Sequence, residues 1–243
     1  MDHTNNSCCC GEAEHFSGCL ICGAPITYRA ESSIQTCSIC HKEQLTNAVC
    51  ENGHFICDAC HSYGTYAPVI TTLRDSTEKD ALLLLEKIMD LPSVHMHGPE
   101  HHAIVPCVLL TAFRNNGEHM DYDAALSEIC KRAKQVPGGT CGYWGVCGAA
   151  AGAGIFMSVM TGSSPLYKDA WPFPQKLVSI ILSRLADVGG PRCCKRTSRI
   201  AIEEAVHFYS QFCSVNIPLS SITCKYCEDN RECIQEDCPY YPE

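Results

Sequence analysis

The sequence predicts a mainly α-helical protein, in which a helical domain follows a small cysteine-rich zinc module and precedes a cysteine-rich tail. Apolar residues recur at helical spacing through the middle of the chain. Cysteines make up 21 of the 243 residues and gather in C-x-x-C pairs towards both ends. We therefore expect a disordered arm at residues 1–17, a zinc-binding module at 18–66, a helical domain at 72–215 and a metal-binding tail at 216–243.

Composition and charge argue against several classes of protein. The net charge is −9 and no basic block is present, so the chain lacks the electrostatic signature of a nucleic-acid-binding protein. No apolar run reaches the ~18 residues that a membrane span needs, and the polar N-terminus does not resemble a signal peptide. Without an export signal, the cysteines indicate metal thiolates in a reducing cytoplasm rather than disulfides. So many thiols also fit an anaerobic host.

The cysteines between positions 19 and 60, together with one histidine, predict two closed zinc sites. A C-x-x-C turn presents two sulfurs to one ion, which is the spacing that tetrahedral zinc favours. The eight expected ligands are Cys19, Cys22, Cys37, Cys40, Cys50, His54, Cys57 and Cys60. A cross-brace would combine Cys19, Cys22, Cys50 and His54 in one site and the other four in the second. Alternatively, two pairs hold a single ion and the rest stay free. The segment is too short and polar to fold on a core, so metal would supply its stability, and its role is structural or a docking surface.

Helices are predicted where apolar periodicity meets an end signal. Asp75, with Glu78 three residues on, is the expected cap of a helix through Met89, and Thr197 or Ser198 is the expected cap of the last helix. The other helices are expected at 103–110, from Asp121 or Asp123 to before Pro137, at 147–160 and at 176–187.

A glycine-rich stretch from Gly138 to Gly154 carries Cys141 and Cys147. Glycine lets the backbone approach closely whatever the thiolates hold. A helix that starts near Cys147 would direct its free N–H groups and positive dipole end at an anionic centre, such as an iron–sulfur cluster. The alternative is a loop followed by a core helix of small residues.

Two further clusters contain potential ligands. Cys193 and Cys194 stand among three cations (Arg192, Lys195 and Arg196), where positive charge favours thiolate and an anionic cluster or substrate. The tail carries Cys224, Cys227, Cys233 and Cys238, whose spacing suits an iron–sulfur cluster or another zinc ion. Four histidines at 95, 97, 101 and 102 are either a metal or proton-handling site or part of an exposed loop.

Three stretches occur in an informative order: Ile104-Val105-Pro106-Cys107-Val108-Leu109-Leu110, Gly139-Thr140-Cys141-Gly142 through Gly154, and Gly189-Gly190-Pro191-Arg192-Cys193-Cys194-Lys195-Arg196-Thr197. Over residues 98–210 they resemble the V-V-P helix, the G-C-Q-x-E-V-G-x-A segment and the G-G-x-x-x-x-P-C-x-x-R-N segment of the iron–sulfur L-serine dehydratases (α-domain) and the related L-cysteine desulfidases. The whole chain also resembles an uncharacterised cysteine-rich domain family of strict anaerobes.

The resemblance implies a helical domain with a 4Fe–4S cluster on Cys141, Cys193 and Cys194, whose open iron acts as a Lewis acid on a hydroxyl, thiol or carboxylate. That family's third cluster cysteine, before Asp-Pro, has no counterpart near Ala186. Cys147, the second of the adjacent pair, or the tail cysteines are the candidates to replace it.

The sequence therefore favours an iron–sulfur enzyme, a lyase or sulfur-transfer enzyme that acts on a small amino or hydroxy acid. Arg192, Lys195 and Arg196 are expected to attract a carboxylate, and Tyr143 and His101 (or His102) are candidates for proton transfer. The competing class is a non-enzymatic metal–cysteine scaffold that relays electrons or sulfur to a partner enzyme, docked through the zinc module. In a third interpretation every site holds structural zinc.

Overall fold

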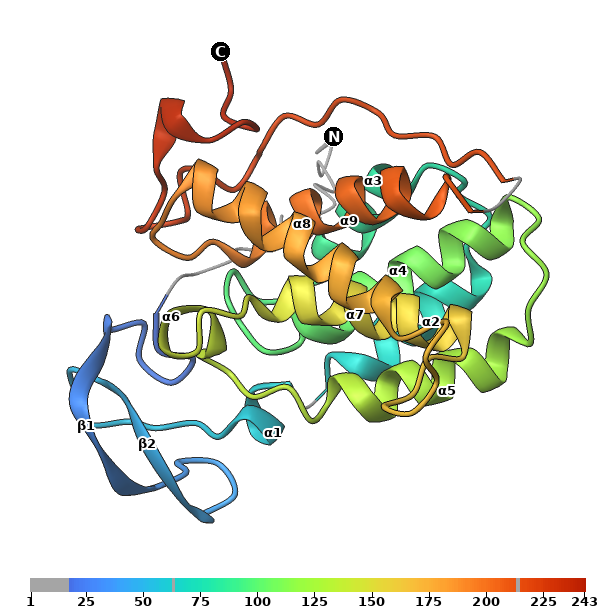
Figure 1. Cartoon of the computed structure of the whole chain (residues 1–243). Coiled ribbons are helices and arrows are strands. Elements are labelled where there is room, and N and C mark those ends of the chain that lie inside the picture. The colour runs from blue at the N-terminus through green and yellow to red at the C-terminus, as the bar shows by residue number, and fades with distance from the viewer. Residues whose placement is uncertain (1–17, 63, 213–214) are drawn as a thin grey trace, which may run out of the picture.

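The computed structural model describes residues 18–62, 64–212 and 215–243, and the arm predicted at 1–17, with Cys8, Cys9 and Cys10, lies outside them. The mainly helical class is confirmed: within the described residues a two-stranded hairpin stands at one end of a body of packed helices (Figure 1). No helix in this part of the chain is long and apolar enough to cross a membrane.

The N-terminal module is built on an antiparallel hairpin of β1 (Ile26–Thr36) and β2 (Glu43–Cys50), followed by the short helix α1 (Asp58–His61). Ile26 pairs with Cys50 at one end of the ladder and Thr36 with Glu43 at the other. Four buried residues form the apolar centre of the module, namely Cys37, Val49, Phe55 and Cys57. Two of these four are expected metal ligands, so little apolar burial is left to stabilise the hairpin by itself.

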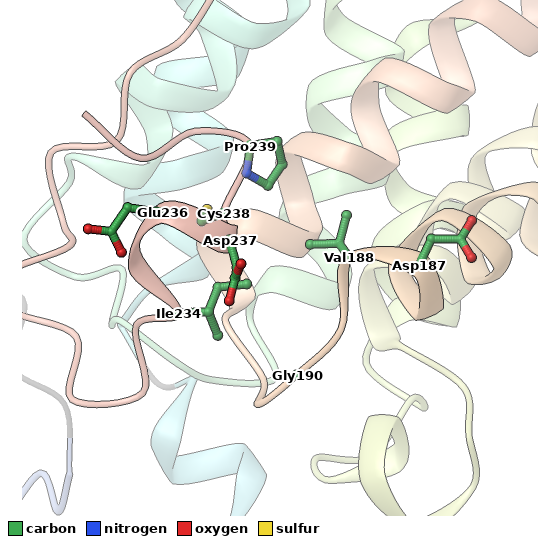
Figure 2. Close-up of a pocket in the computed structure, with 8 residues that line it drawn as sticks. All are labelled: Asp187, Val188, Gly190, Ile234, Glu236, Asp237, Cys238 and Pro239. Carbon is green, nitrogen blue, oxygen red and sulfur yellow. The ribbon is translucent and has the colours of Figure 1, made fainter. Parts of the chain in front are cut away.

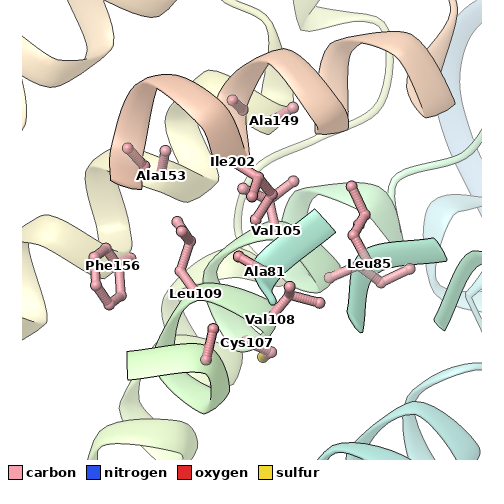
Figure 3. Close-up of a cluster of buried hydrophobic side chains, with 14 of the residues drawn as sticks. Ala81, Leu85, Val105, Cys107, Val108, Leu109, Ala149, Ala153, Phe156 and Ile202 are labelled. Atoms are coloured by element: carbon pink, nitrogen blue, oxygen red, sulfur yellow. The ribbon is translucent and has the colours of Figure 1, made fainter. Parts of the chain in front are cut away.

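The helical body is organised around α4 (His101–Asn115), whose residues are buried from His101 to Phe113. Helices α3 (Ala81–Met89), α5 (Tyr122–Ala133), α7 (Gly148–Thr161) and α9 (Cys194–Tyr209) pack against it. The close-up in Figure 3 shows side chains of α3, α4, α7 and α9 meeting in one apolar cluster. Helix α2 (Tyr66–Asp75) also contacts α4, and α8 (Pro172–Val188) lies against α7 and α9.

Small residues let α7 approach α4 closely. A Cβ atom at Gly148 would lie 2.1 Å from the imidazole of His102, and one at Gly152 would lie 2.5 Å from the His102 carbonyl oxygen. A Cβ at either position would overlap atoms of α4, so glycine is required there for the two helices to pack at this distance. The helix begins where the sequence predicts: Cys147 is its N-cap, and Gly162 ends it in the left-handed conformation with φ 64°.

Two helix caps differ from the prediction. Asp75 is the last residue of α2, and Asp80 caps α3 instead, since its carboxylate accepts hydrogen bonds from the backbone N–H groups of Leu82 and Leu83. Helix α9 begins before the predicted Thr197 or Ser198, because the Cys193 thiol acts as the cap and accepts from the Arg196 N–H at 3.4 Å. Of the two aspartates proposed to start α5, Asp121 is the cap.

The C-terminal tail runs back along the helical body and ends beside the C-terminus of α8 (Figure 1). Its ends are joined by a hydrogen bond from the Cys224 N–H to the Tyr240 carbonyl at 2.6 Å. Arg199 of α9 lies over the rings of Tyr226 and Tyr240, and this guanidinium is held by the Glu86 carboxylate of α3 at 2.7 and 2.9 Å. A buried charged pair thus attaches the tail to the core.

Candidate metal centres

The eight expected zinc ligands meet in two groups of four within the N-terminal module. One group joins Cys19, Cys22, Cys50 and His54, and the other joins Cys37, Cys40, Cys57 and Cys60. In each group the ligand atoms all lie within 4.8 Å of one another. One group joins the pair before β1 to the end of β2 and the residues after it, and the other joins the turn between the strands to the pair around α1, which is the cross-brace alternative. Both groups can hold a metal ion.

The spacing within the groups fits a tetrahedral ion. Metal–sulfur bonds of about 2.3 Å and metal–nitrogen bonds of about 2.0–2.1 Å place ligand atoms about 3.6–3.8 Å apart. The sulfurs of Cys22 and Cys50 are 3.9 Å apart, and those of Cys40 and Cys57 are 3.7 Å apart. The His54 Nδ1 atom lies 3.5 Å from the Cys50 sulfur and 3.3 Å from the Cys22 sulfur. The donor sets and distances therefore suit a tetrahedral metal ion such as zinc or iron.

The module also forms one wall of a pocket against the helical body. The Gly138 N–H donates to the Asp58 carboxylate of α1 at 2.8 Å. The Arg192 guanidinium lies 5.4 Å from the ring centroid of Tyr28 on β1. Between these contacts is a pocket of about 670 Å³ lined by both parts of the chain. That volume is in the range of small-molecule sites.

Two of the cysteines predicted to hold a cluster line this pocket, although they come from distant segments. Cys141, in α6 (Thr140–Tyr143), and Cys194, the first residue of α9, both contribute to its wall together with Arg192. Burial, with the neighbouring thiols of Cys147 and Cys193, raises the pKa of the Cys194 thiol to about 12, against the opposing effect of Arg192.

Two helices begin at the cysteines beside this pocket. Cys147 caps α7 and Cys193 caps α9. Burial raises the pKa of both thiols. Hydrogen bonds from the N–H groups of the first turn act in the opposite direction, because they stabilise the thiolate. The positive ends of two helix dipoles therefore lie at the predicted cluster ligands.

The tail cysteines are further apart than those of the module. In the described part of the chain, Cys224, Cys227, Cys233 and Cys238 are not among the groups with ligand atoms all within 4.8 Å. Cys224 lies close enough to Cys193 to raise the pKa of its thiol, after the larger effect of burial. Cys238 borders a separate pocket of about 420 Å³, shown in Figure 2. Acidic side chains of α8 and the tail line that pocket, so it does not suit an anionic ligand.

The predicted catalytic residues lie in different places. Arg192 and Tyr143 line the larger pocket, whereas Lys195, Arg196 and His101 are not part of its lining. The Lys195 ammonium donates to the Met89 carbonyl at 2.9 Å, and the Arg196 guanidinium donates to the carbonyls of Gly189 and Pro191. Arg196 thus holds the backbone just before the cysteine pair, whereas Lys195 bonds the end of α3. Burial lowers the pKa of His101 to about 3, and its Nε2 lies 3.0 Å from the His95 carbonyl oxygen.

A third group of potential metal ligands, His61, His95 and Glu100, was not predicted from the sequence. Glu100 is fully buried, and its two carboxylate oxygens lie 3.3 Å from His61 Nδ1 and 3.0 Å from His95 Nδ1. Despite burial, which acts to raise it, the pKa of Glu100 is held well below its usual range by these two imidazoles. His95 was among the four histidines singled out, but His61 and Glu100 come from elements 39 residues apart. Only the fold brings them together.

The fold and these clusters define a helical protein with a cysteine-rich metal-ligand module. The chain belongs to a family of unknown function, DUF5714, whose model matches residues 69–241. The matched region covers the helical body and most of the tail, while the two four-ligand groups precede it. No curated protein and no solved structure matches the chain. The resemblance to the iron–sulfur serine dehydratases therefore stays a prediction.

Proposed function

We propose that the N-terminal module binds two zinc ions and that the pocket beside it carries an iron–sulfur centre with which the protein acts on a small amino or hydroxy acid. One observation carries the proposal: Cys141 and Cys194, from distant segments, line one pocket with a guanidinium. Cys147 and Cys193 cap helices next to them. Thiols at helix N-termini, a cation and a cavity of ligand size together suit an anionic cluster and an anionic substrate.

Zinc is the metal we assign to the module. The ligand sets are three cysteines with one histidine and four cysteines, which are typical of closed structural zinc sites. The module has a small apolar centre, so ion binding supplies much of its folding free energy. Its role in this proposal is to complete the wall of the pocket.

The donor set at the pocket suits an iron–sulfur cluster better than a single ion. Cys141, Cys147 and Cys194 are the proposed ligands. Cluster irons are held by cysteine thiolates. The Cys141 thiol acts to raise the pKa of Cys147, and Cys147 acts to raise the pKa of Cys194, although the three form no group within 4.8 Å in the described residues. When bound, such a cluster supplies a Lewis acid. Arg192 is placed to bind a substrate carboxylate, and the Tyr143 hydroxyl is the candidate proton donor.

A second candidate function is electron or sulfur relay without catalysis on a small molecule. It is favoured by a series of neighbouring thiols, four of which have a pKa raised in part by another member of the series. The series runs through Cys141, Cys147, Cys194, Cys193, Cys224, Cys227 and Cys233. Such a series connects the pocket to the tail surface, where a partner enzyme would dock.

The experiment is anaerobic purification of the full chain with quantitation of iron, zinc and labile sulfide. We expect two zinc ions, together with iron and sulfide in similar amounts and a broad visible absorption. Cys141→Ala and Cys194→Ala should lose most of that absorption, whereas Cys130→Ala, a matched change of a thiol outside the pocket, should retain it. A colourless protein that contains zinc alone overturns the cluster.

Substrate addition separates the two functions. Spectral change on adding L-serine or L-cysteine, abolished in Arg192→Ala, supports the enzyme. A cluster that responds to neither compound, but is reduced and reoxidised reversibly, supports the relay.

A further inference from the structure

The cluster of His61, His95 and Glu100 lies at the junction of the two parts of the chain. His61 ends α1 of the module, directly after the metal-ligand candidate Cys60, whereas His95 and Glu100 belong to the segment that leads into α4. Their ligand atoms all lie within 4.8 Å of one another. Both histidines also line the pocket, and their side chains are 20% and 25% exposed. The buried Glu100 therefore closes the cluster towards the helical body, and the two histidines leave it open to the pocket.

The distances suit a divalent transition metal. Bonds of about 2.0–2.2 Å to imidazole nitrogen and carboxylate oxygen separate these atoms by about 3.3–3.5 Å around a tetrahedral ion. The measured separations are 3.3 Å for His61 Nδ1 to Oε2 and 3.0 Å for His95 Nδ1 to Oε1. The two imidazoles approach different oxygens of one carboxylate, and the ligand atoms of the three side chains all lie within 4.8 Å of one another, close enough to share an ion.

The surroundings hold the carboxylate in place. A Cβ atom at Gly98 would lie 2.1 Å from the Glu100 Oε2 atom, so only glycine leaves room for the carboxylate there. The His95 N–H donates to Oε1 at 3.2 Å, and the His95 carbonyl is in turn fixed by His101. Lys195 is the nearby cation on α9, but its ammonium donates to the Met89 carbonyl. A fully buried carboxylate that faces two imidazoles has the preorganisation of a metal ligand.

We propose that His61, His95 and Glu100 bind a third transition-metal ion, such as Zn²⁺ or Fe²⁺, with an open coordination position facing the pocket. Two histidines and one carboxylate are the ligand set of catalytic rather than structural metal sites, because the remaining position is free for water or substrate. The site does not depend on the iron–sulfur cluster, since it shares no ligand with it. Because His61 and His95 line the same cavity as Cys141 and Cys194, the bound ion would place a Lewis acid in that cavity.

The test uses Co²⁺ as the probe and the full chain. A mild chelator first removes loosely held metal while the closed thiolate sites stay loaded, and Co²⁺ is then titrated into the protein. The expected result is binding of about one further equivalent, with visible bands of tetrahedral or five-coordinate Co²⁺ and no sulfur-to-cobalt charge transfer. His95→Ala and His61→Ala, each at a partly exposed side chain, should lose this binding. His207→Ala, an exposed histidine on α9, is the matched control and should keep it.

The Cys141→Ala variant separates this site from the proposed cluster. Retention of the Co²⁺ bands in Cys141→Ala supports the third site whether or not iron is present. The proposal is overturned if the wild type takes up no further Co²⁺, or if the bands persist in both histidine variants. Charge-transfer bands that vanish in Cys141→Ala would assign the ion to the thiols instead.

Discussion

Replacement of Gly148 by alanine tests the packing on which the pocket depends. The new methyl carbon would lie 2.1 Å from both Cδ2 and Nε2 of His102, more than 1 Å inside ordinary contact. The imidazole has little freedom to move, since its Nδ1 lies 3.1 Å from the Val136 carbonyl oxygen. Overpacking of this kind costs about 1–3 kcal/mol. At about 2–4 °C per kcal/mol for a chain of this size, the melting temperature should fall by about 2–12 °C.

The assay is urea and thermal unfolding of the metal-loaded protein. Gly142→Ala is the matched control, because nothing lies within 4 Å of a Cβ at that position, and its effect should stay within about 0.5 kcal/mol. A double-mutant cycle with His102→Ala isolates the clash. Once the ring is removed, Gly148→Ala should cost much less. Equal stability of Gly148→Ala and wild type, or the same cost in the His102→Ala background, would refute the reasoning.

Three further predictions concern other parts of the chain. Chelation of the module metals should expose residues 26–57 to hydrogen exchange while the core helices stay protected, because ion binding replaces a core there. Alkylation of Cys130, followed by peptide mass spectrometry, should rise with pH through a midpoint near 7 rather than 8.5–9. The Cys107 thiol at 3.8 Å lowers the Cys130 pKa to about 7 by hydrogen bonding and so favours thiolate. Glu86→Ala should cost about 3–5 kcal/mol in urea unfolding, since it leaves the buried Arg199 charge unpaired.

Each of these predictions has a result that would contradict it. Unchanged exchange in the hairpin after complete metal removal would show that the module folds by itself. An alkylation midpoint that does not move upward in Cys107→Ala would mean that the neighbouring thiol is not the cause. If Glu86→Ala lowers the free energy of unfolding by less than about 1 kcal/mol, the Arg199 guanidinium is in contact with water.

The sequence was most informative where ligands are local. The C-x-x-C spacing identified the eight side chains that meet in two groups, since each turn brings its own pair of sulfurs together. The end of α7 and the Asp121 cap follow from residues whose backbone preference is strong. By contrast, Cys193 was not expected as a cap because a thiol is an unusual acceptor in that role. The cluster at Glu100 depends on tertiary packing, and no spacing in the sequence indicates it.

The hairpin supplies one side of the pocket through Tyr28, and α1 supplies His61. If metal binding folds this module, the supply of metal ions decides what fraction of the molecules has a complete pocket wall. A cell short of that metal would then accumulate helical bodies with an open, incomplete face. Metal loading would thereby act as a checkpoint in maturation, before any chemistry in the cavity begins.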